Sequence, residues 1–279
     1  MDVLKPFDPW RGTFCTCPPK YSLHPYTGCS HSCLYCYATA YIKARSSTPK
    51  KNFVRRLIRD LRRADPSKPI SISNSSDPYP PEEEKLCLTR RVLEVLAPTA
   101  FKTLIVTKSD RVVRDLDLLV KGNFAVTLTI TTLDDSLAAD IEPGAPRPSR
   151  RLRAIEKLVE AGVPVGVRVD PVIPGLNDDP DELKELVRVL KGLNVRFVVT
   201  STYKARPDNL RRVCEAFPEL GRKLKRLYRE EGMWVRGYWY LKPVLRRKLL
   251  RPVVEEARRL DMEYATCREG FTGPNWRNS

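Results

Sequence analysis

The sequence predicts an α/β fold in which a parallel sheet is covered by helices and curls into a barrel or partial barrel. Short runs rich in Val, Ile and Thr alternate with longer runs whose apolar residues recur at helical spacing. Six such strands alternate with helices, which is typical of parallel sheets with right-handed crossovers. A cysteine-rich loop directly follows the first strand. This places the loop at the C-terminal ends of the strands, where ligands bind in such folds.

Each element is predicted from its own pattern. The predicted strands cover residues 20–26, 69–73, 101–107, 124–131, 163–172 and 195–200. The predicted helices cover 51–63, 83–96, a segment starting at Asp110, a segment capped by Ser149 and ending at Gly162, and a segment starting at Asp179. Asp179-Pro180-Asp181-Glu182 is a helix start with proline in the first turn. The pattern also becomes helical after Tyr37, and Cys87 is predicted to be buried within a helix.

The chain divides into three predicted regions. Residues 1–21 form an irregular lead-in, 22–203 form the barrel, and 204–279 form a helical, basic, aromatic-rich extension packed on it. Residues 204–260 carry 17 Lys and Arg against 7 Asp and Glu, so +10 of the net charge lies there. They also contain Trp234, Tyr238, Trp239 and Tyr240. These aromatics suit either a stacking platform for unpaired bases or the packing of helices onto the barrel.

Composition restricts the class of protein. The 279 residues are 42% hydrophobic, enough for a substantial core. No apolar run approaches the ~20 residues of a membrane span, and the N-terminus lacks the apolar core of a signal peptide. We therefore expect a cytoplasmic protein without a membrane partner. Eight cysteines in a reducing compartment indicate ligands, catalytic groups or buried thiols rather than disulfides.

The net charge of +16 favours a polyanionic partner, nucleic acid first. The alternative is the surface of a thermophile, because the chain has no glutamine and many Glu, Lys and Arg. The helix predicted over 51–63 has the same ambiguity. One of its faces carries arginines that suit either solvation or phosphate contact, namely Arg55, Arg56, Arg59, Arg62 and Arg63.

Cys29, Cys33 and Cys36 form a C-x3-C-x2-C motif with Tyr35 before the last cysteine. Thiolates suit iron–sulfur clusters and zinc, and three ligands on one loop leave one metal position open for chemistry. The alternatives are a zinc knuckle that lacks a ligand, or three buried thiols. Cys15 and Cys17 form either part of a second metal site or a pair of free thiols.

The motif resembles the signature of the radical SAM superfamily. This resemblance implies a partial (β/α)6 barrel and a [4Fe–4S] cluster held by Cys29, Cys33 and Cys36. It also implies S-adenosylmethionine (SAM), bound at the remaining iron through its amino and carboxylate groups. One-electron reduction then cleaves SAM to methionine and a 5′-deoxyadenosyl radical, while the protein binds, orients and shields the cofactors.

Beyond the cysteines, residues 22–200 are similar to the spore-photoproduct-lyase-like branch, also called DNA repair photolyase-like. Ser76 and Asp77 resemble the branch's Ser/Thr-Asp-Pro segment, which holds the methionine amino group of SAM. Lys108 resembles the lysine that pairs with the methionine carboxylate. Thr129 begins a hydroxyl-bearing segment near the ribose and carboxylate. The resemblance therefore implies SAM binding by Ser76, Asp77, Lys108 and Thr129.

Two further segments match the branch, and one position departs from it. Glu142-Pro143-Gly144 with Arg151, and the adenine-lining residues 171–175, match in order. Repair enzymes of this branch have a cysteine hydrogen-atom donor just before the Ser-Asp segment, where this chain has Asn74. Asparagine has no sulfur from which to donate a hydrogen atom, so the sequence speaks against repair of the spore photoproduct. Cys267, in the C-terminal tail, is another candidate donor.

The resulting expectation is a radical SAM enzyme that acts on nucleic acid, in repair or modification. It would need an electron donor such as ferredoxin or flavodoxin. One alternative is a radical SAM enzyme that acts on a peptide, a protein or a small molecule. The other is a non-catalytic nucleic-acid-binding protein with a structural metal.

Overall fold

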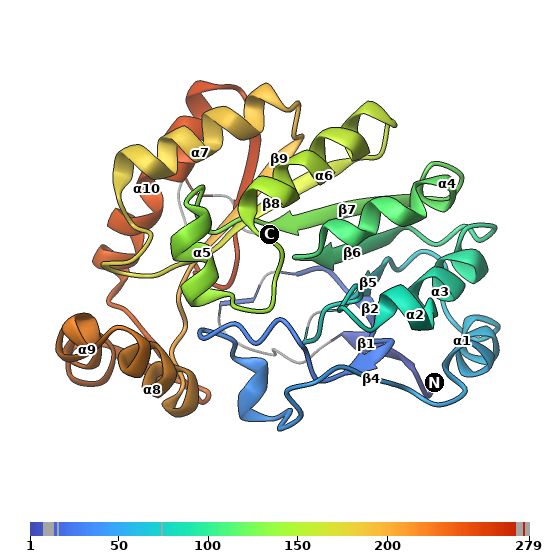
Figure 1. Cartoon of the computed structure of the whole chain (residues 1–279), viewed down its shortest axis with the longest axis horizontal. Helices are drawn as coiled ribbons and strands as arrows, with labels where there is room; N and C mark the ends of the chain where they lie inside the picture. Colours follow the sequence, from blue (N-terminus) through green and yellow to red (C-terminus); the bar gives the residue numbers. More distant parts are fainter. Residues whose placement is uncertain (8–13, 16, 74, 272–275, 277–279) are drawn as a thin grey trace.

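The computed structural model describes residues 1–7, 14, 15, 17–73, 75–271 and 276. Its centre is an eight-stranded sheet in the order β1-β2-β5-β6-β7-β8-β9-β12 (Figure 1). The strands of this sheet are β1 (Leu4–Phe7), β2 (Lys20–Leu23), β5 (Ile70–Ile72), β6 (Thr103–Thr107), β7 (Phe124–Thr129), β8 (Val165–Val172), β9 (Phe197–Thr202) and β12 (Glu263–Thr266). Two separate antiparallel pairs are β3 (Tyr26–Thr27) with β4 (Thr48–Pro49), and β10 (Met233–Val235) with β11 (Tyr238–Tyr240).

The strand pairing confirms a partial barrel, with the six predicted strands side by side. From β2 through β9, each strand of the central sheet pairs in parallel with the next. The sheet order begins at β1 and ends at β12, so the sheet is open. Two edge strands extend the predicted six. β1 pairs antiparallel with β2, and β12 pairs parallel with β9. The region boundaries after residues 21 and 203 remain predictions.

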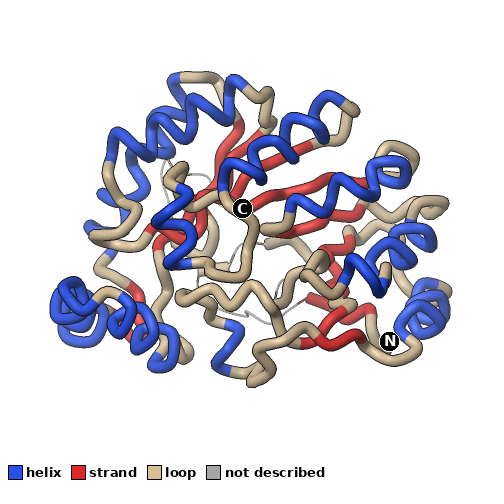
Figure 2. The backbone as a smooth tube through the Cα atoms, in the orientation of Figure 1, coloured by secondary structure: helices blue, strands red, loops and turns tan. Residues whose placement is uncertain are grey.

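Helices surround the sheet on its outer side, and loops gather on the inner side (Figures 1 and 2). The helices are α1 (Phe53–Leu61), α2 (Glu83–Leu86), α3 (Leu88–Leu96), α4 (Leu116–Leu119), α5 (Asp135–Ile141), α6 (Pro148–Glu160), α7 (Pro180–Gly192), α8 (Pro207–Ala216), α9 (Pro218–Lys225) and α10 (Pro243–Arg259). Three shorter turns are η1 (Ala38–Ala40), η2 (Asp110–Asp115) and the π-helical η3 (Arg226–Glu230).

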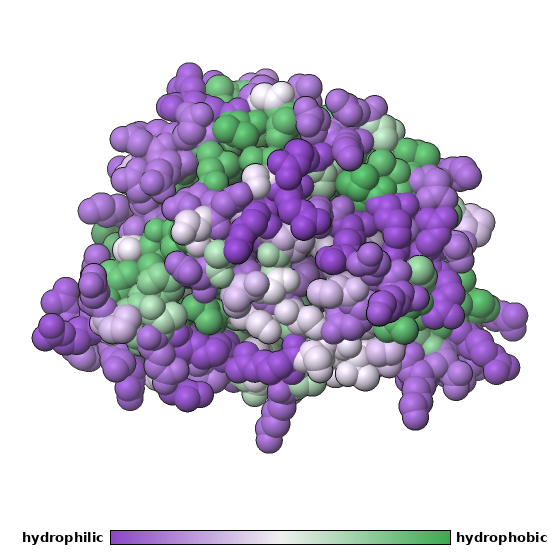
Figure 3. All heavy atoms as spheres, viewed as in Figure 1, coloured by the Kyte–Doolittle hydropathy of each residue, from purple (hydrophilic) through white to green (hydrophobic). Residues whose placement is uncertain are grey.

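The core lies between the sheet and these helices. Central strand residues such as Val126, Val167 and Val198 are fully buried, as parallel strands covered by helices require. Hydrophilic side chains dominate the face shown in Figure 3, with scattered apolar patches between them. No helix in the described part of the chain is long and apolar enough to cross a membrane. The cytoplasmic location remains a prediction.

The two predicted helix caps have different outcomes. The start of α7 is confirmed, because the Asp179 carboxylate accepts hydrogen bonds from the N–H groups of Asp181 and Glu182 and Pro180 is the first helical residue. The prediction that Ser149 caps a helix is wrong. Helix α6 begins at Pro148, whose fixed φ suits the first helical position, and Ser149 lies in the first turn. Its hydroxyl donates instead to Asp135.

Several predicted elements are shorter or interrupted. The helix over 83–96 breaks into α2 and α3 at Cys87, which has φ 47° and is partly exposed rather than buried. The buried Glu83 carboxylate explains the break, since it accepts the N–H groups of Thr89 and Arg90 at the start of α3. The helix expected from Asp110 is η2 followed by α4, and the pattern after Tyr37 gives only η1. The first strand divides into β2 and β3.

The segment after residue 203 continues the same body. Helix α10 packs on α7 and β9, and β12 then joins the sheet. Helices α8 and α9 pack together and lead through η3 into the β10–β11 hairpin. The backbone groups of Ala205 and Trp239 exchange two hydrogen bonds, which join this hairpin to the chain just before α8.

Candidate metal centre and cofactor site

The three motif cysteines lie on the loop between β3 and η1, after the first barrel strand. All three are free thiols, with Cys33 buried and Cys29 and Cys36 partly buried. Two tight turns shape the loop: the N–H of Ser32 donates to Cys29 O (3.3 Å), and the N–H of Cys36 donates to Cys33 O (3.2 Å). Both turns lie within the motif and join neighbouring motif residues through the backbone.

Burial dominates the electrostatics of these thiols. It raises the pKa of Cys29 to about 12, with the Asp77 charge adding to the effect. Burial also raises the pKa of Cys33 well above its ordinary value, and Lys108 partly opposes this. The thiolates therefore need a compensating cation, and metal binding deprotonates such ligands.

The number and kind of the ligands decide which metal group this loop could hold. Among the described residues, no group of three or more His, Cys, Asp or Glu side chains converges as a site for one metal ion. A structural zinc needs four ligands around one point, at about 2.3 Å for sulfur. An iron–sulfur cluster contains several irons, so its cysteines need not converge on one atom. The three cysteines supply the kind of thiolate ligand that an iron–sulfur cluster uses.

Asp77 follows β5 and joins the ends of two neighbouring strands. Its Oδ1 accepts from Thr107 Oγ1 (2.6 Å) and the N–H of Tyr79 (2.9 Å), and its Oδ2 accepts from the N–H of Lys108 (2.8 Å). His31 Nδ1 lies 3.4 Å from Oδ2. Burial alone would raise the pKa of Asp77, but His31 and these hydrogen bonds lower it to about 2. Asp77 therefore carries a charge beside the cysteine loop.

Lys108, at the end of β6, presents an ammonium group towards the cysteine loop. Its Nζ lies 5.5 Å from the centre of the Tyr35 ring and makes no hydrogen bond to a described residue. Burial opposes its charge, yet the pKa of Lys108 is raised because Cys33 and Glu142 attract the ammonium. The group is thus a partly buried cation able to receive a carboxylate.

Ser76 and Thr129 lie at the ends of two other strands. The Ser76 hydroxyl donates to Tyr26 O (3.3 Å), which leaves its oxygen able to accept. Thr129 ends β7 and is buried, and its carbonyl accepts from Arg151 Nη1 (2.9 Å). Strands β5, β6 and β7 therefore bring all four predicted SAM-binding residues to one edge of the sheet, beside the loop.

A buried acid–base pair supports the loop from below. Glu142 and Arg151 lie 2.5 Å apart and are almost fully buried. Tyr35, in the cysteine loop, donates its hydroxyl to Glu142, and Thr131 Oγ1 donates to the same carboxylate at 3.2 Å. Burial would raise the pKa of Glu142, but Arg151 and Lys108 hold it below its ordinary value. The predicted Glu-Pro-Gly segment is thus tied to Tyr35.

Backbone contacts complete this support. The N–H of Gly144 donates to His31 O, and the N–H of Leu34 donates to Ile141 O, both at 2.9 Å. A Cβ on Gly144 would lie far inside van der Waals contact with Ser30 O, so only glycine allows this approach. In Figure 1 the segment after α5 lies beside the loop after β2.

Helix α8 holds the loop from the opposite side, and the sequence patterns did not reveal it. Arg212 and Asn209 donate hydrogen bonds to the carbonyls of Leu34, Tyr35 and Cys36. These contacts join residues more than 170 positions apart, so no local pattern signals them. The sequence predicted a helical, basic extension over 204–279, without a separate helix at these residues.

The remaining predicted residues lie elsewhere or are not described. Asn74 lies outside the described residues. Cys15 and Cys17 share a side-chain hydrogen bond, which lowers the pKa of Cys15 to about 6. Cys267 follows β12, and its backbone N–H donates to Thr200 O at 3.0 Å. A second metal site at these cysteines remains a hypothesis.

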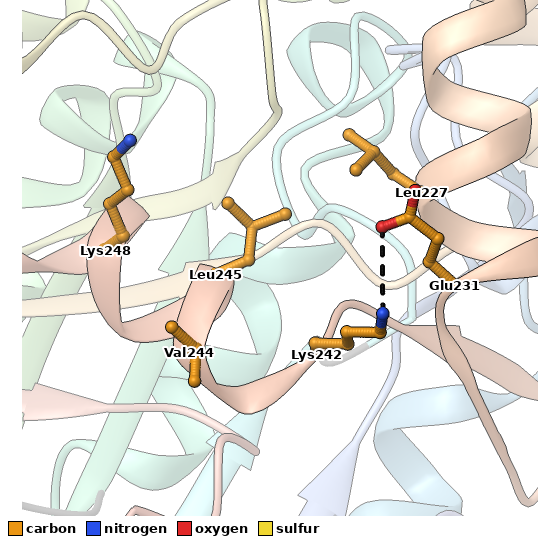
Figure 4. Close-up of a pocket in the computed structure, with 6 residues that line it drawn as sticks. All are labelled: Leu227, Glu231, Lys242, Val244, Leu245 and Lys248. Atoms are coloured by element: carbon orange, nitrogen blue, oxygen red, sulfur yellow. Dashed lines mark ion pairs between the residues drawn. The ribbon is translucent and has the colours of Figure 1, made fainter.

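A cavity of about 230 Å³ lies between η3 and the start of α10 (Figure 4). Lys242 and Glu231 point towards each other at its side and form an ion pair of 3.9 Å. Its other lining residues are Leu227, Val244, Leu245 and Lys248. None of them belongs to the cysteine loop or the predicted SAM segments, so the cavity is separate from the candidate site.

The comparisons identify sequence relatives. A family model described as "Radical SAM superfamily" matches residues 23–190. An uncharacterized protein of Methanocaldococcus jannaschii is 36% identical over 163 residues, covering 57% of this chain and 62% of that protein. An uncharacterized protein of Mycobacterium tuberculosis (strain H37Rv) is 28% identical over 233 residues, covering 76% of this chain and 68% of that protein. The chain thus spans less than two thirds of the Methanocaldococcus protein.

Solved structures share the fold. Spore photoproduct lyase complexed with dinucleoside spore photoproduct has a TM-score of 0.67 and 18% identity, covering 88% of this chain and 75% of that chain. Streptococcus suis SuiB bound to the precursor peptide SuiA has a TM-score of 0.60 and 16% identity, covering 88% of this chain and 48% of that chain. One similar spore photoproduct lyase structure contains bound AdoMet, with a TM-score of 0.68 and 20% identity over 94% of this chain and 80% of that chain.

Proposed function

Because the chain belongs to the radical SAM superfamily, we propose that it is an enzyme that cleaves SAM reductively at a [4Fe–4S] cluster held by Cys29, Cys33 and Cys36. The superfamily implies an iron–sulfur cluster and SAM. The observation that carries the proposal is the three-cysteine loop beside the partly buried ammonium of Lys108 at the C-terminal edge of the sheet. When bound, the cluster would supply the electron that releases the 5′-deoxyadenosyl radical from SAM.

The protein's own groups would orient SAM. Lys108 offers an ammonium for the methionine carboxylate, a charge-assisted contact. Ser76 can accept from the amino group while it donates to Tyr26 O. Three hydrogen bonds and His31 already surround the oxygens of Asp77. Asp77 would therefore contribute to SAM binding mainly through its negative charge and by fixing the backbone of Lys108. Thr129 supplies a buried hydroxyl at the end of β7.

We propose nucleic acid as the substrate class. The β10–β11 hairpin presents Trp234, which is 55% exposed, with Trp239 packed edge-on at 4.8 Å. Arg229 lies over Trp239 at 5.6 Å. The hairpin also reaches the cysteine loop region, because Tyr238 contacts Tyr37 directly after the third cysteine. Aromatic and basic side chains together suit unpaired bases and their phosphates.

A second candidate substrate class is a peptide or protein, supported by the similar fold of SuiB, whose structure holds a precursor peptide. Salt-sensitive binding separates the two classes, since phosphate contacts weaken steeply with added salt. If single-stranded DNA and RNA do not bind at low salt, the nucleic-acid proposal fails. A ferredoxin or flavodoxin would supply the electron in either case.

The decisive experiment is anaerobic. The protein is reconstituted with iron and sulfide, and SAM and a strong reductant are added before 5′-deoxyadenosine is assayed. We expect product from the wild type and none from Cys33→Ala. A wild-type protein that holds its cluster but yields no 5′-deoxyadenosine would overturn the proposal, as would zinc in place of iron.

A further inference from the structure

We infer that helix α8 completes the cluster site, with Arg212 and Asn209 as positioning residues for the cysteine loop. The inference rests on the proposed function, because it concerns the cluster that Cys29, Cys33 and Cys36 would hold. It adds a part of the protein beyond the matched family region, which ends at residue 190. The basic C-terminal region would then be part of the cofactor site.

Three consecutive carbonyls of the loop each receive a side-chain donor from α8. Arg212 Nε donates to Leu34 O and Arg212 Nη2 to Cys36 O, both at 3.1 Å. Asn209 Nδ2 donates to Tyr35 O at 3.0 Å. The two side chains therefore hold every backbone carbonyl from Leu34 to the third cysteine.

Both side chains are themselves fixed. Asn209 is fully buried, and its Oδ1 accepts from the Tyr203 hydroxyl at 2.6 Å and from the N–H of Arg206 at 2.7 Å. The side chain of Arg212 is 13% exposed, and its Nη1 lies 3.0 Å from Asp208 Oδ2. Two donors on one planar guanidinium give a geometry that few other side chains reproduce.

Asp208 shows that the role is positional more than electrostatic. Its carboxylate accepts from Arg212 and also from the Thr39 hydroxyl at 2.6 Å, just beyond the loop. The guanidinium charge is therefore balanced locally. Across each trans peptide the carbonyl and the next N–H point in opposite directions, so fixing these carbonyls also fixes the N–H directions of residues 35–37. Hydrogen bonds around the sulfurs are one determinant of a cluster's potential.

The test compares Arg212→Gln with Arg211→Gln in the anaerobically reconstituted full chain. Arg211 is adjacent on α8, 68% exposed, and paired only weakly with Glu215 at 3.7 Å. Outer-shell partners typically change metal affinity 10- to 100-fold, so we expect a chelator to remove iron about tenfold faster from Arg212→Gln. We also expect a shifted midpoint potential by EPR-monitored titration. Arg211→Gln should match the wild type in both.

Arg212→Lys keeps the charge and the Asp208 pair but lacks the planar fork. This second variant keeps the test valid if Arg212→Gln does not fold. Thermal unfolding of the cluster-free proteins shows whether each variant is folded. Faster iron loss from Arg212→Lys, with an unchanged unfolding temperature, supports positioning. Wild-type iron release and potential in both Arg212 variants would overturn the inference while leaving the proposed function intact. A wild-type protein that binds no iron–sulfur cluster would instead overturn both.

Discussion

At the scale of single residues, buried or partly buried charges of both signs surround the cysteine loop. Asp77 and Glu142 are the anions, and Lys108 and Arg151 are the cations. Glu142 and Arg151 neutralise each other at 2.5 Å, while Asp77 is satisfied by hydrogen bonds. The Lys108 ammonium makes no hydrogen bond to a described residue and is attracted at longer range by Cys33, Glu142 and Asp77. A bound carboxylate would give this partly buried ammonium a direct partner.

Lys108→Met therefore should weaken SAM binding to the cluster-loaded protein. A hydrogen bond to a charged group is worth about 1.5–3 kcal/mol, which corresponds to about 10- to 100-fold in Kd. Equilibrium dialysis with labelled SAM measures this. Lys102→Met is the control, because Lys102 is exposed just before the opposite end of the same strand, β6. Equal affinities in the two variants would remove Lys108 from the SAM site.

Reasoning from the sequence located these residues through the resemblance to the radical SAM branch. Ser76 and Asp77 follow the strand predicted over 69–73, Lys108 follows the strand predicted over 101–107, and parallel strands end at a common edge. The residues it missed act across the fold. Asn209 and Arg212 reach the loop from more than 170 positions away, and their roles depend on how α8 docks.

At the scale of elements, the segment from α5 to α6 acts as a support for the loop. Gly144→Ala should disturb it, because the added methyl would meet Ser30 O and His31 Cα. Overpacking typically costs about 1–3 kcal/mol, and the displaced loop should also retain less iron. Gly192→Ala is the control, since a methyl group at this position in α7 would have no neighbour within 4 Å. Urea unfolding measures the free energy of unfolding of both variants. Equal values would show that the cysteine loop can shift to accommodate the added methyl group.

A second element-scale prediction concerns the docking of α10 on α7. Arg259 and then Arg188 lower the pKa of Glu256 from 4.5 to about 2 by hydrogen bonding. Because the pKa of Glu256 is lower in the folded state than in the unfolded state, its ionised carboxylate stabilises the folded protein at pH values above the unfolded pKa. This stabilisation is lost as the pH falls from about 4.5 to about 2. The stability gap between wild type and Glu256→Gln should be about 1 kcal/mol at pH 7 and should shrink over that range.

Urea unfolding at several pH values checks this linkage. Glu255→Gln is the matched control, because Glu255 is 61% exposed and lies 3.8 Å from Arg251. It should show little pH-dependent difference from wild type. A gap for Glu256→Gln that stays constant down to about pH 2 would contradict the assigned ion pairs.

Element types were more predictable than their ends. Periodicity identified the six barrel strands and the main helices, because each buries a regular apolar face. The break at Cys87 was missed, since it depends on a buried Glu83 that caps the next helix. Strand β1 was missed as well. Its four residues show a buried-to-exposed pattern too short to distinguish from an irregular segment.

At the scale of the whole molecule, charge distribution matters more than the total of +16. The arginine face of α1 is partly neutralised, because Asp2 pairs with Arg56 at 2.5 Å and with Arg59 at 3.0 Å. The surface around the β10–β11 hairpin combines basic residues with the exposed Trp234. The first surface therefore fits the solvated interpretation, and the second fits contact with a polyanion.

Two triple variants with the same charge change distinguish local from global attraction. Changing Arg206, Arg229 and Arg236 to Gln should weaken binding of single-stranded DNA and reduce the slope of log Kd against log salt, because these residues lie over Tyr238, over Trp239 and in the turn of the hairpin. The slope falls by about 0.7 for each phosphate that the protein no longer neutralises, so a decrease of about 2 is expected. Changing Arg55, Arg62 and Arg63 to Gln should leave the slope near that of the wild type. Equal decreases in both would mean that net charge alone attracts the strand, and the hairpin would lose its assigned role as the binding surface.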